Sequence, residues 1–279
     1  MSKPAAPKVH QVAQTGFGEG TNDLYDQARP SYPAGVFEII AKALPPAPTG
    51  GYTILEPGAG TGIFSRLVLS PPDGYVRLPI SQLVGVEPSA GMRQAWDKAY
   101  AKIDPKSLLA KGSIVDGSFE DFSQSGVEKG SADLVAIAQA WHWCPDHESA
   151  LREIAAYLSP HGLFVLVWNQ ESQEIPWQRD IRALYQDYDK GTPQQYKGWW
   201  KSMYDTKAYT ELFAPPEEHS IPWTVGLTEE QFIDRIMSKS FLTEQNLSGQ
   251  AREDFLAKAR AIIRADDKEW IDKEVSYRA

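Results

Sequence analysis

The sequence predicts an α/β protein built on a doubly wound, mostly parallel β-sheet. Short apolar runs alternate with segments of helical periodicity over the first two thirds of the chain, a pattern typical of parallel sheets covered by helices. The clearest unit begins at residues 52–62, where an apolar run ends in three glycines at alternate positions. Apolar residues then recur at helical spacing over residues 63–69. This strand, glycine turn and helix organise the rest of the chain.

The composition is that of a globular protein. The chain has 279 residues, of which 42% are hydrophobic and 23% charged, and this length allows a substantial core. The net charge of −9 argues against nucleic acid and anionic membranes as partners. Cys144 is the single cysteine, so no internal disulfide forms, which fits a reducing compartment. Without a spanning run or an apolar core in residues 1–10, a cytoplasmic protein is expected.

The glycine-rich turn has three possible interpretations. A phosphate-binding loop requires a lysine after Gly62, and the dinucleotide fingerprint requires a glycine at position 63, which is isoleucine. The third is an acidic residue followed by alternate glycines, here Glu56 and then Gly58, Gly60 and Gly62. A purely structural glycine turn is the alternative to all three.

Glu56-Pro-Gly-Ala-Gly-Thr-Gly62 resembles the first motif of the class I S-adenosylmethionine (SAM) dependent methyltransferases. The resemblance covers residues 23–170 strongly and the remainder loosely. It implies a seven-stranded, Rossmann-like methyltransferase sheet with its last strand antiparallel, and SAM as the cofactor. It implies cofactor contacts from Glu56 and the three glycines, and no metal is expected.

A second strand over residues 83–87 ends in Glu87. An acid at the tip of this strand accepts hydrogen bonds from ribose hydroxyls. Glu87 lies 25 positions after Gly62, and an insertion at residues 71–81 accounts for the long spacing. The resemblance implies that Pro88 and Met92 follow as cofactor-binding residues, with Met92 against adenine, although its helical spacing is also that of a core residue.

A third strand over residues 108–115 leads to Ser118, Phe119 and Glu120. Relatives carry an aspartate at the place of Ser118, where it accepts from the adenine amino group, so this contact is in doubt. A contact from the Phe119 backbone survives the change. Glu120 either replaces the lost acceptor or is solvated. Upstream, the Tyr-x3-Arg-Pro-x-Tyr-Pro segment implies that Tyr25 and Arg29 bind the cofactor's methionine end.

Arg29 can hold a carboxylate through two parallel hydrogen bonds, or it packs on Tyr25 at the surface. The same segment places Tyr32 in the pocket. The fourth strand, residues 132–138, runs into Gln139-Ala-Trp-His-Trp143, which resembles the family's segment at this place. Gln139 is expected at the cofactor and Trp143 in the substrate pocket.

Trp141 and His142 are the candidate catalytic residues. Trp141 would help to position the acceptor. His142 is either a general base or, the favoured role, a residue that orients its loop through hydrogen bonds to backbone. Cys144 is expected to be a bystander, because methyl transfer needs no covalent enzyme intermediate.

Four regions are expected along the chain. Residues 1–22 read as a flexible tail, 23–170 as the SAM-binding core, 171–215 as a helical substrate lid, and 216–279 as strands and helices that complete the core and the substrate pocket. In the last region a strand is expected over residues 218–224, and Thr228 and Gln231 predict a capping box at the start of a helix. Seven of the nine tryptophans lie between residues 141 and 223, which indicates an aromatic substrate chamber or simple core packing. Trp177, Trp199 and Trp200 are the lid residues expected to face the substrate.

The resemblance implies methyl transfer to a small molecule by a monomeric enzyme. Among these relatives the chain looks most similar to fungal small-molecule methyltransferases, which include enzymes acting on the thiols of reduced gliotoxin and on trans-aconitate. A tryptophan-rich lid suits a bulky apolar acceptor, so S-methylation of a fungal dithiol metabolite such as reduced gliotoxin is favoured. Carboxyl O-methylation of the trans-aconitate type is the alternative, but it should require several arginines, and only Arg29, Arg179 and Arg182 are plausible. A non-catalytic SAM-fold regulator is an alternative of another class, and an NAD oxidoreductase is a distant third.

Overall fold

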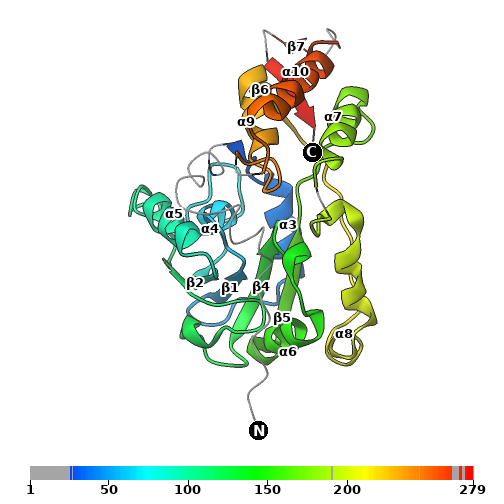
Figure 1. Cartoon of the computed structure of the whole chain (residues 1–279). Helices are drawn as coiled ribbons and strands as arrows, with labels where there is room; N and C mark the ends of the chain where they lie inside the picture. The colour runs from blue at the N-terminus through cyan, green and yellow to red at the C-terminus, as the bar shows by residue number, and fades with distance from the viewer. Residues whose placement is uncertain are drawn as a thin grey trace.

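The core of the molecule is a parallel sheet of five strands (Figure 1). The computed structural model describes residues 26, 28–189, 191–244, 246–265, 270–271 and 274–278. The strand order is β3-β2-β1-β4-β5, so the connections run outwards in opposite directions from β1 and β4, and a crevice forms where they diverge. The strands are β1 (Tyr52–Pro57), β2 (Ile80–Val86), β3 (Lys111–Val115), β4 (Ala132–Ala138) and β5 (Leu158–Val167).

Helical segments cover both faces of this sheet, as the sequence predicts. Neighbouring strand residues alternate between two cores: Ile54 belongs to one and Leu55 to the other, and both are fully buried. The first core takes its helical residues from α3 (Ala34–Ala43), α4 (Ile63–Leu69) and α5 (Ala90–Tyr100). The second takes them from α6 (His147–Tyr157), the 3-10 segment η4 (Trp199–Asp205) and α8 (Lys207–Leu212). The α/β class with a doubly wound parallel sheet is therefore confirmed.

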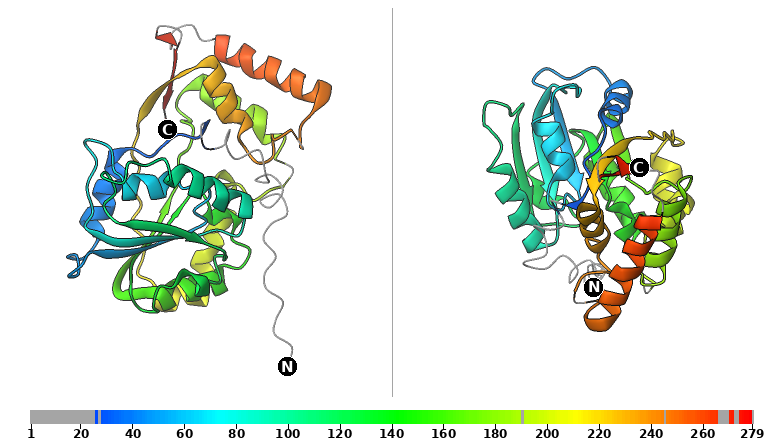
Figure 2. Two further views of the ribbon diagram at one scale, coloured as in Figure 1. Left: turned by 90° about the vertical axis from the view of Figure 1, so that its left-hand side faces the viewer. Right: turned by 90° about the horizontal axis from the view of Figure 1, so that it is seen from above.

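A second group of elements lies over one end of the sheet and is called the cap below (Figure 2). Its helices share an apolar core in which Trp177, Tyr185, Phe232 and Phe255 are at most 4% exposed. Thr228 and Gln231 form a capping box at the start of its middle helix, as predicted. The cap comprises α7 (Pro176–Gln186), β6 (Thr224–Thr228), α9 (Glu229–Met237), α10 (Gly249–Ala265), β7 (Trp270–Ile271) and β8 (Glu274–Arg278).

Two predictions about the second half of the chain differ from the structure. Within the described residues, β6 and β8 pair with each other in an antiparallel sheet of order β6-β8-β7, and neither extends the five-stranded sheet to seven strands. The expected strand at residues 218–224 begins only at Thr224.

The expected lid at residues 171–215 is divided between two places. Its first helix, α7, packs in the cap, whereas Trp200 and Met203 of η4 are buried in the core on one face of the sheet. The reason is that each half has its own apolar surface to bury, so no single lid forms. The expected tail, residues 1–22, and Tyr25 lie outside the described residues. Across the described part of the chain, no helix combines the length and apolar character needed to cross a membrane.

Candidate functional site

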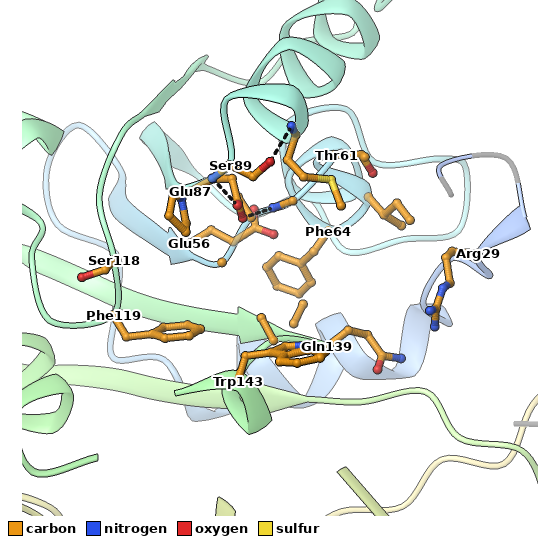
Figure 3. Close-up of a pocket in the computed structure, with 18 of the residues that line it drawn as sticks. Arg29, Glu56, Thr61, Phe64, Glu87, Ser89, Ser118, Phe119, Gln139 and Trp143 are labelled. Atoms are coloured by element: carbon orange, nitrogen blue, oxygen red, sulfur yellow. Dashed lines mark hydrogen bonds between the residues drawn. The ribbon is translucent and has the colours of Figure 1, made fainter. Parts of the chain in front are cut away.

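A cavity lies in the crevice at the carboxyl ends of the parallel strands (Figure 3). Its empty volume is about 1160 Å³ when the space open to solvent is included. Concave sites of this kind are where cofactors and small substrates bind. Most of its lining comes from the turns that follow β1, β2, β3 and β4. The principal lining residues are Arg29, Pro30, Tyr32, Glu56, Gly58, Gly60, Thr61, Phe64, Glu87, Pro88, Ser89, Met92, Ser118, Phe119, Glu120, Gln139, Trp143 and Pro145.

The three glycines after β1 have different physical roles, although all have positive φ. A Cβ on Gly58 would lie 2.6 Å from the Cβ of Ala140, and one on Gly62 would lie 2.3 Å from the Trp96 ring, so packing alone requires glycine at both places. A Cβ on Gly60 would meet nothing within 4 Å. Gly60 thus leaves its space to the cavity.

Glu87 joins the turn after β1 to the turn after β2. Its carboxylate accepts hydrogen bonds from the backbone nitrogen of Gly60 at 3.1 Å and from that of Ser89 at 2.9 Å. Burial raises the pKa of Glu87 despite these two bonds. Pro88 and Met92 follow Glu87 in the cavity wall. Met92 is only 4% exposed, so it also packs in the core, and it has both the cavity position and the core position expected for it.

Glu56 lies at the end of β1 and is 1% exposed. Its carboxylate accepts a hydrogen bond from the Ser65 hydroxyl, which in turn accepts one from the Trp96 indole at 2.9 Å. Burial raises the pKa of Glu56 to about 8. A second acidic group thus borders the glycine turn, held in place by a buried hydrogen-bond chain.

Ser118 and Phe119 lie at one end of the cavity (Figure 3), and Glu120, the next residue, also lines it. The Ser118 hydroxyl accepts from the Glu120 backbone nitrogen at 3.3 Å, so it is occupied locally. Among the described residues, the buried Oε1 atom of Glu120 has no hydrogen-bond partner, and burial raises the pKa of this carboxyl. An unpartnered acceptor at a cavity wall is the arrangement expected of a group that meets a ligand donor.

Arg29 lies across the cavity from Ser118 and Phe119, and Gln139 lies between the two ends (Figure 3). The Arg29 guanidinium donates to the backbone oxygen of Ser238 at 3.2 Å, which links this end of the cavity to the segment after α9. Tyr32, 4% exposed, lines the cavity nearby.

Gln139 has a φ of +58°, rare for a residue with a side chain, directly after β4. Its side-chain nitrogen donates to the backbone oxygen of Asn169 at 3.0 Å, and its backbone nitrogen donates to the backbone oxygen of Val167 at 2.8 Å. The residue is therefore held firmly beside the cavity. Trp143, four residues on, also lines it.

The two candidate catalytic residues do not line the cavity. Trp141 is fully buried, and its indole donates to the sulfur of Met203 at 2.9 Å, so it packs against η4 and its positioning role stays a prediction. His142 accepts a hydrogen bond from the Trp168 indole at 3.2 Å. Burial lowers its pKa to about 3, so His142 is too weakly basic to serve as the general base. Its loop-orienting contact is made with a side chain instead of with backbone.

The three lid tryptophans expected to face the substrate are not among the residues that line the cavity. Trp177 packs on Phe232 in the cap core at 5.0 Å, and Trp200 stacks on Trp168 at 4.7 Å in a core of the sheet. Trp199 is 54% exposed at the surface. Core packing accounts for two of the three tryptophans, because large apolar rings gain most from complete burial.

Sequence reasoning missed several lining residues, chiefly Thr61, Phe64, Ser89 and Pro145. Thr61 and Ser89 are next to predicted contacts, so their place in the motifs was a usable signal. Phe64 lies on the first turn of α4, where helical spacing alone assigns it to the core. Burial raises the pKa of Cys144, which keeps this residue a thiol, as its bystander role requires.

The fold and the site define a class of protein that binds an adenosyl cofactor at the carboxyl edge of a parallel sheet. Three features of the site fit an adenosyl group: the open space beside Gly60, the Glu87 carboxylate at the end of β2 and the unpartnered Glu120 acceptor. An adenosyl group offers hydroxyls and an amino group as donors, and these carboxylates offer acceptors.

Comparison with known proteins narrows this class. Residues 55–166 match the family model described as a methyltransferase domain. A protein of Mycobacterium tuberculosis described as an uncharacterized methyltransferase is 29% identical over 88% of this chain and 85% of its own length. An uncharacterized methyltransferase-like protein of Schizosaccharomyces pombe is 28% identical over 78% and 75%. The crystal structure of the YcgJ protein from Bacillus subtilis superposes with a TM-score of 0.49 at 17% identity, covering 88% of this chain and 93% of YcgJ.

The domain match, the relatives and the site agree, and the chain is a SAM-dependent methyltransferase. Its cofactor is SAM, as the glycine motif implies.

Proposed function

We propose that this methyltransferase acts on a small molecule whose acceptor atom reacts without a general base on the protein. The observation that carries the proposal is the composition of the Arg29 end of the cavity. The Arg29 guanidinium and the Gln139 amide lie on the side of the cavity away from the Glu56 and Glu87 carboxylates (Figure 3). A thiolate or a carboxylate acceptor meets this condition; an amine or an alcohol does not.

The roles of the residues follow from their places. Glu87 would hold the ribose, and Phe119 and Met92 would enclose the adenine, with Glu120 as an acceptor for its amino group. Arg29 would bind the carboxylate of the methionine moiety through its guanidinium. SAM supplies an electrophilic methyl group on a sulfonium. Tyr32 and Trp143 would exclude water near it and stabilise positive charge with their ring faces.

Alignment of the acceptor supplies most of the expected acceleration. Two acceptor classes are kept within the proposal. S-methylation of a fungal dithiol such as reduced gliotoxin rested on a tryptophan-rich lid, and Trp177, Trp199 and Trp200 lie outside the cavity. These three tryptophans therefore give no support to a bulky apolar substrate. Carboxyl O-methylation, of which the trans-aconitate type is one form, therefore gains relative to it.

A methyl-transfer assay with matched acceptors tests the proposal. Labelled SAM is supplied with thiols and carboxylates, and in parallel with amines and alcohols of the same carbon skeletons. We expect product from the first group only. Methylation of amines or alcohols, with none of thiols or carboxylates, would contradict the absence of a required base.

We further propose that the enzyme is a cytosolic monomer. A buried free thiol at Cys144 in a chain without a second cysteine fits a reducing compartment. Light scattering on the purified chain and fractionation of cells test the two statements separately.

A further inference from the structure

A group of buried charges lies where the cap meets the sheet. The carboxylate of Glu171, 7% exposed, comes from the segment between β5 and α7. Its Oε1 atom lies 3.0 Å from Lys239 Nζ and 3.6 Å from Arg235 Nη2. Arg182 of α7 is 8% exposed, and its charge acts on the same carboxylate. We call Glu171, Arg182, Arg235 and Lys239 the cap cluster.

The cap cluster holds three cations and one carboxylate, and Arg182 makes no ion pair among the described residues. Its Nη2 atom donates to the Gln170 side chain at 3.4 Å, and its guanidinium lies 5.3 Å from the Tyr196 ring. Its Nε atom is buried without a hydrogen-bond partner in the described structure. The nearby carboxylate of Asp189 already pairs with Lys197 at 2.8 Å.

A second unpartnered donor lies one turn earlier on α7. Gln178 is fully buried, and within the described residues its Nε2 atom has no hydrogen-bond partner. Residues four apart lie on the same face of a helix, so Gln178 and Arg182 face the same side. Buried donors without acceptors cost stability, so a ligand oxygen would be stabilised here.

Burial and the neighbouring cations lower the pKa of Lys239, and the cations lower the pKa of Glu171. Burial lowers the pKa of Lys239 to about 8, although Glu171 opposes this, and the charges of Arg29 and Arg235 lower it further. Burial alone would raise the pKa of Glu171, but Lys239, Arg235 and Arg182 together hold it below its ordinary value. A single carboxylate therefore does not compensate the buried cations, and a second anion would.

The cap cluster adjoins the Arg29 end of the cavity. Arg29 lines the cavity and bonds to the oxygen of Ser238, the residue before Lys239. A second connection starts at Gln139 in the cavity wall, whose side chain donates to the backbone oxygen of Asn169. The next residue, Gln170, accepts a hydrogen bond from Arg182 of the cap cluster. Short contacts on two sides thus connect the cavity to the cations.

We infer that the cap cluster binds a carboxylate group of the methyl acceptor, so that the substrate is an anionic small molecule. Guanidinium groups bind carboxylates through paired, charge-assisted hydrogen bonds. In the described structure, Arg182 and Gln178 each have a buried donor atom without a hydrogen-bond partner. The inference rests on the proposed function and specifies its substrate class. It concerns how the acceptor is anchored, whichever of its atoms receives the methyl group.

Calorimetry tests the anchor without knowledge of the natural substrate. The full chain, saturated with S-adenosylhomocysteine, is titrated with glutarate, adipate, hexanoate and benzoate, and with the corresponding amides. We expect at least one carboxylate to bind tenfold or more tightly than its amide. Arg182→Gln and Lys239→Met should each reduce that affinity at least tenfold. Arg179→Gln, an exposed arginine on the same helix, should leave it unchanged.

Glu171→Gln should change the affinity for the carboxylate probe in the opposite direction. Removal of the competing carboxylate should strengthen binding of the probe severalfold, whereas a purely structural role for the cluster predicts weaker binding in every variant. If Arg182→Gln fails to fold, Lys239→Met and Glu171→Gln decide the question. The inference is overturned if no carboxylate is preferred over its amide, or if the preference survives both cation variants.

Separate readouts distinguish this result from failure of the proposed function. Affinity for S-adenosylhomocysteine should be equal in wild type and all variants; a loss confined to the cation variants would assign the cluster to the cofactor and overturn the inference. If methyl transfer occurs only to amines or alcohols, the proposed function fails, even if the cap cluster binds carboxylates.

Discussion

The glycine turn after β1 and the cap cluster, the two ligand sites that we propose, are built by different means. At the turn, Glu87 is held by the backbone nitrogens of Gly60 and Ser89, which belong to two local turns. In the cap cluster, Glu171, Arg182 and Lys239 come from separate segments and meet only after the chain has folded. The cofactor end is thus encoded in short motifs, whereas the acceptor end depends on long-range packing.

The most severe test of this contrast is Gly60→Val. A valine side chain would fill the space that opens beside Gly60 and would also strain the backbone at a φ of +56°. We expect SAM binding to be lost in calorimetry. Gly74→Val is the matched control, because Gly74 also has positive φ and no neighbours within 4 Å, but lies outside the cavity lining. Unchanged affinity in Gly60→Val would refute this placement of the cofactor.

Trp177→Ala should have the next largest effect, and on the cap alone. The ring is 4% exposed and packs edge-on against Phe232, so its removal should destabilise the cap by about 3–5 kcal/mol. Hydrogen exchange should show faster exchange in α7 and α9, with the strands of the sheet still protected. Equal loss of protection in β1 and β4 would mean that the cap and the sheet unfold as one unit.

Glu87→Ala should weaken SAM binding by about 1–3 kcal/mol, the value of lost hydrogen bonds to a buried charged group. Calorimetry measures the change, and Asp116→Ala serves as the control, because its exposed carboxylate lies beyond β3 outside the cavity lining. An effect near zero at Glu87 would remove its assignment to the ribose.

Glu56 predicts a pH dependence of stability. Its pKa in the folded state, about 8, lies above its ordinary value of 4.5, so the protonated form is favoured by folding. Its contribution is complete below pH 4.5 and is lost as the pH rises through 8. Between pH 6 and 8, cofactor-free wild type should lose about 2 kcal/mol more unfolding free energy than Glu56→Gln. Parallel curves in denaturant titrations would show that Glu56 ionises normally.

The smallest effect is expected at Trp199. This ring is 54% exposed and lies outside the cavity lining, so Trp199→Ala should change stability by less than about 0.5 kcal/mol and leave the KM for the acceptor unaltered. A large rise in KM would return Trp199 to the substrate site and restore the idea of a lid.

Local signals were sufficient for much of the fold and for the cofactor end of the site. Three of these features depend only on residues close together in the sequence, so local motifs are enough to predict them. They are the glycine turn, the acid at the end of β2 and the Thr228 capping box. The strand expected at residues 218–224 was misplaced, because β6 is defined by pairing with β8, with Thr224 opposite Arg278. Periodicity carries no information about so distant a partner.

The acceptor end was harder to predict for the same reason. Trp177 and Trp200 have the composition of a pocket wall, yet only the packed structure shows that they fill cores instead. Arg182 was recognised as a plausible neighbour of the site, whereas Arg235 and Lys239 carry no motif. Their significance arises from the shared carboxylate of Glu171.

The contact between Gly58 and Ala140 also limits how this enzyme can change. A Cβ on Gly58 would overlap that of Ala140, so the ends of β1 and β4 touch with no spare room. Evolution or engineering that enlarges residue 140 to accept a new substrate would displace the turn that holds the cofactor. Gly58 has no side chain to lose, so it cannot compensate for a larger residue 140, and the cap offers more freedom for such a change.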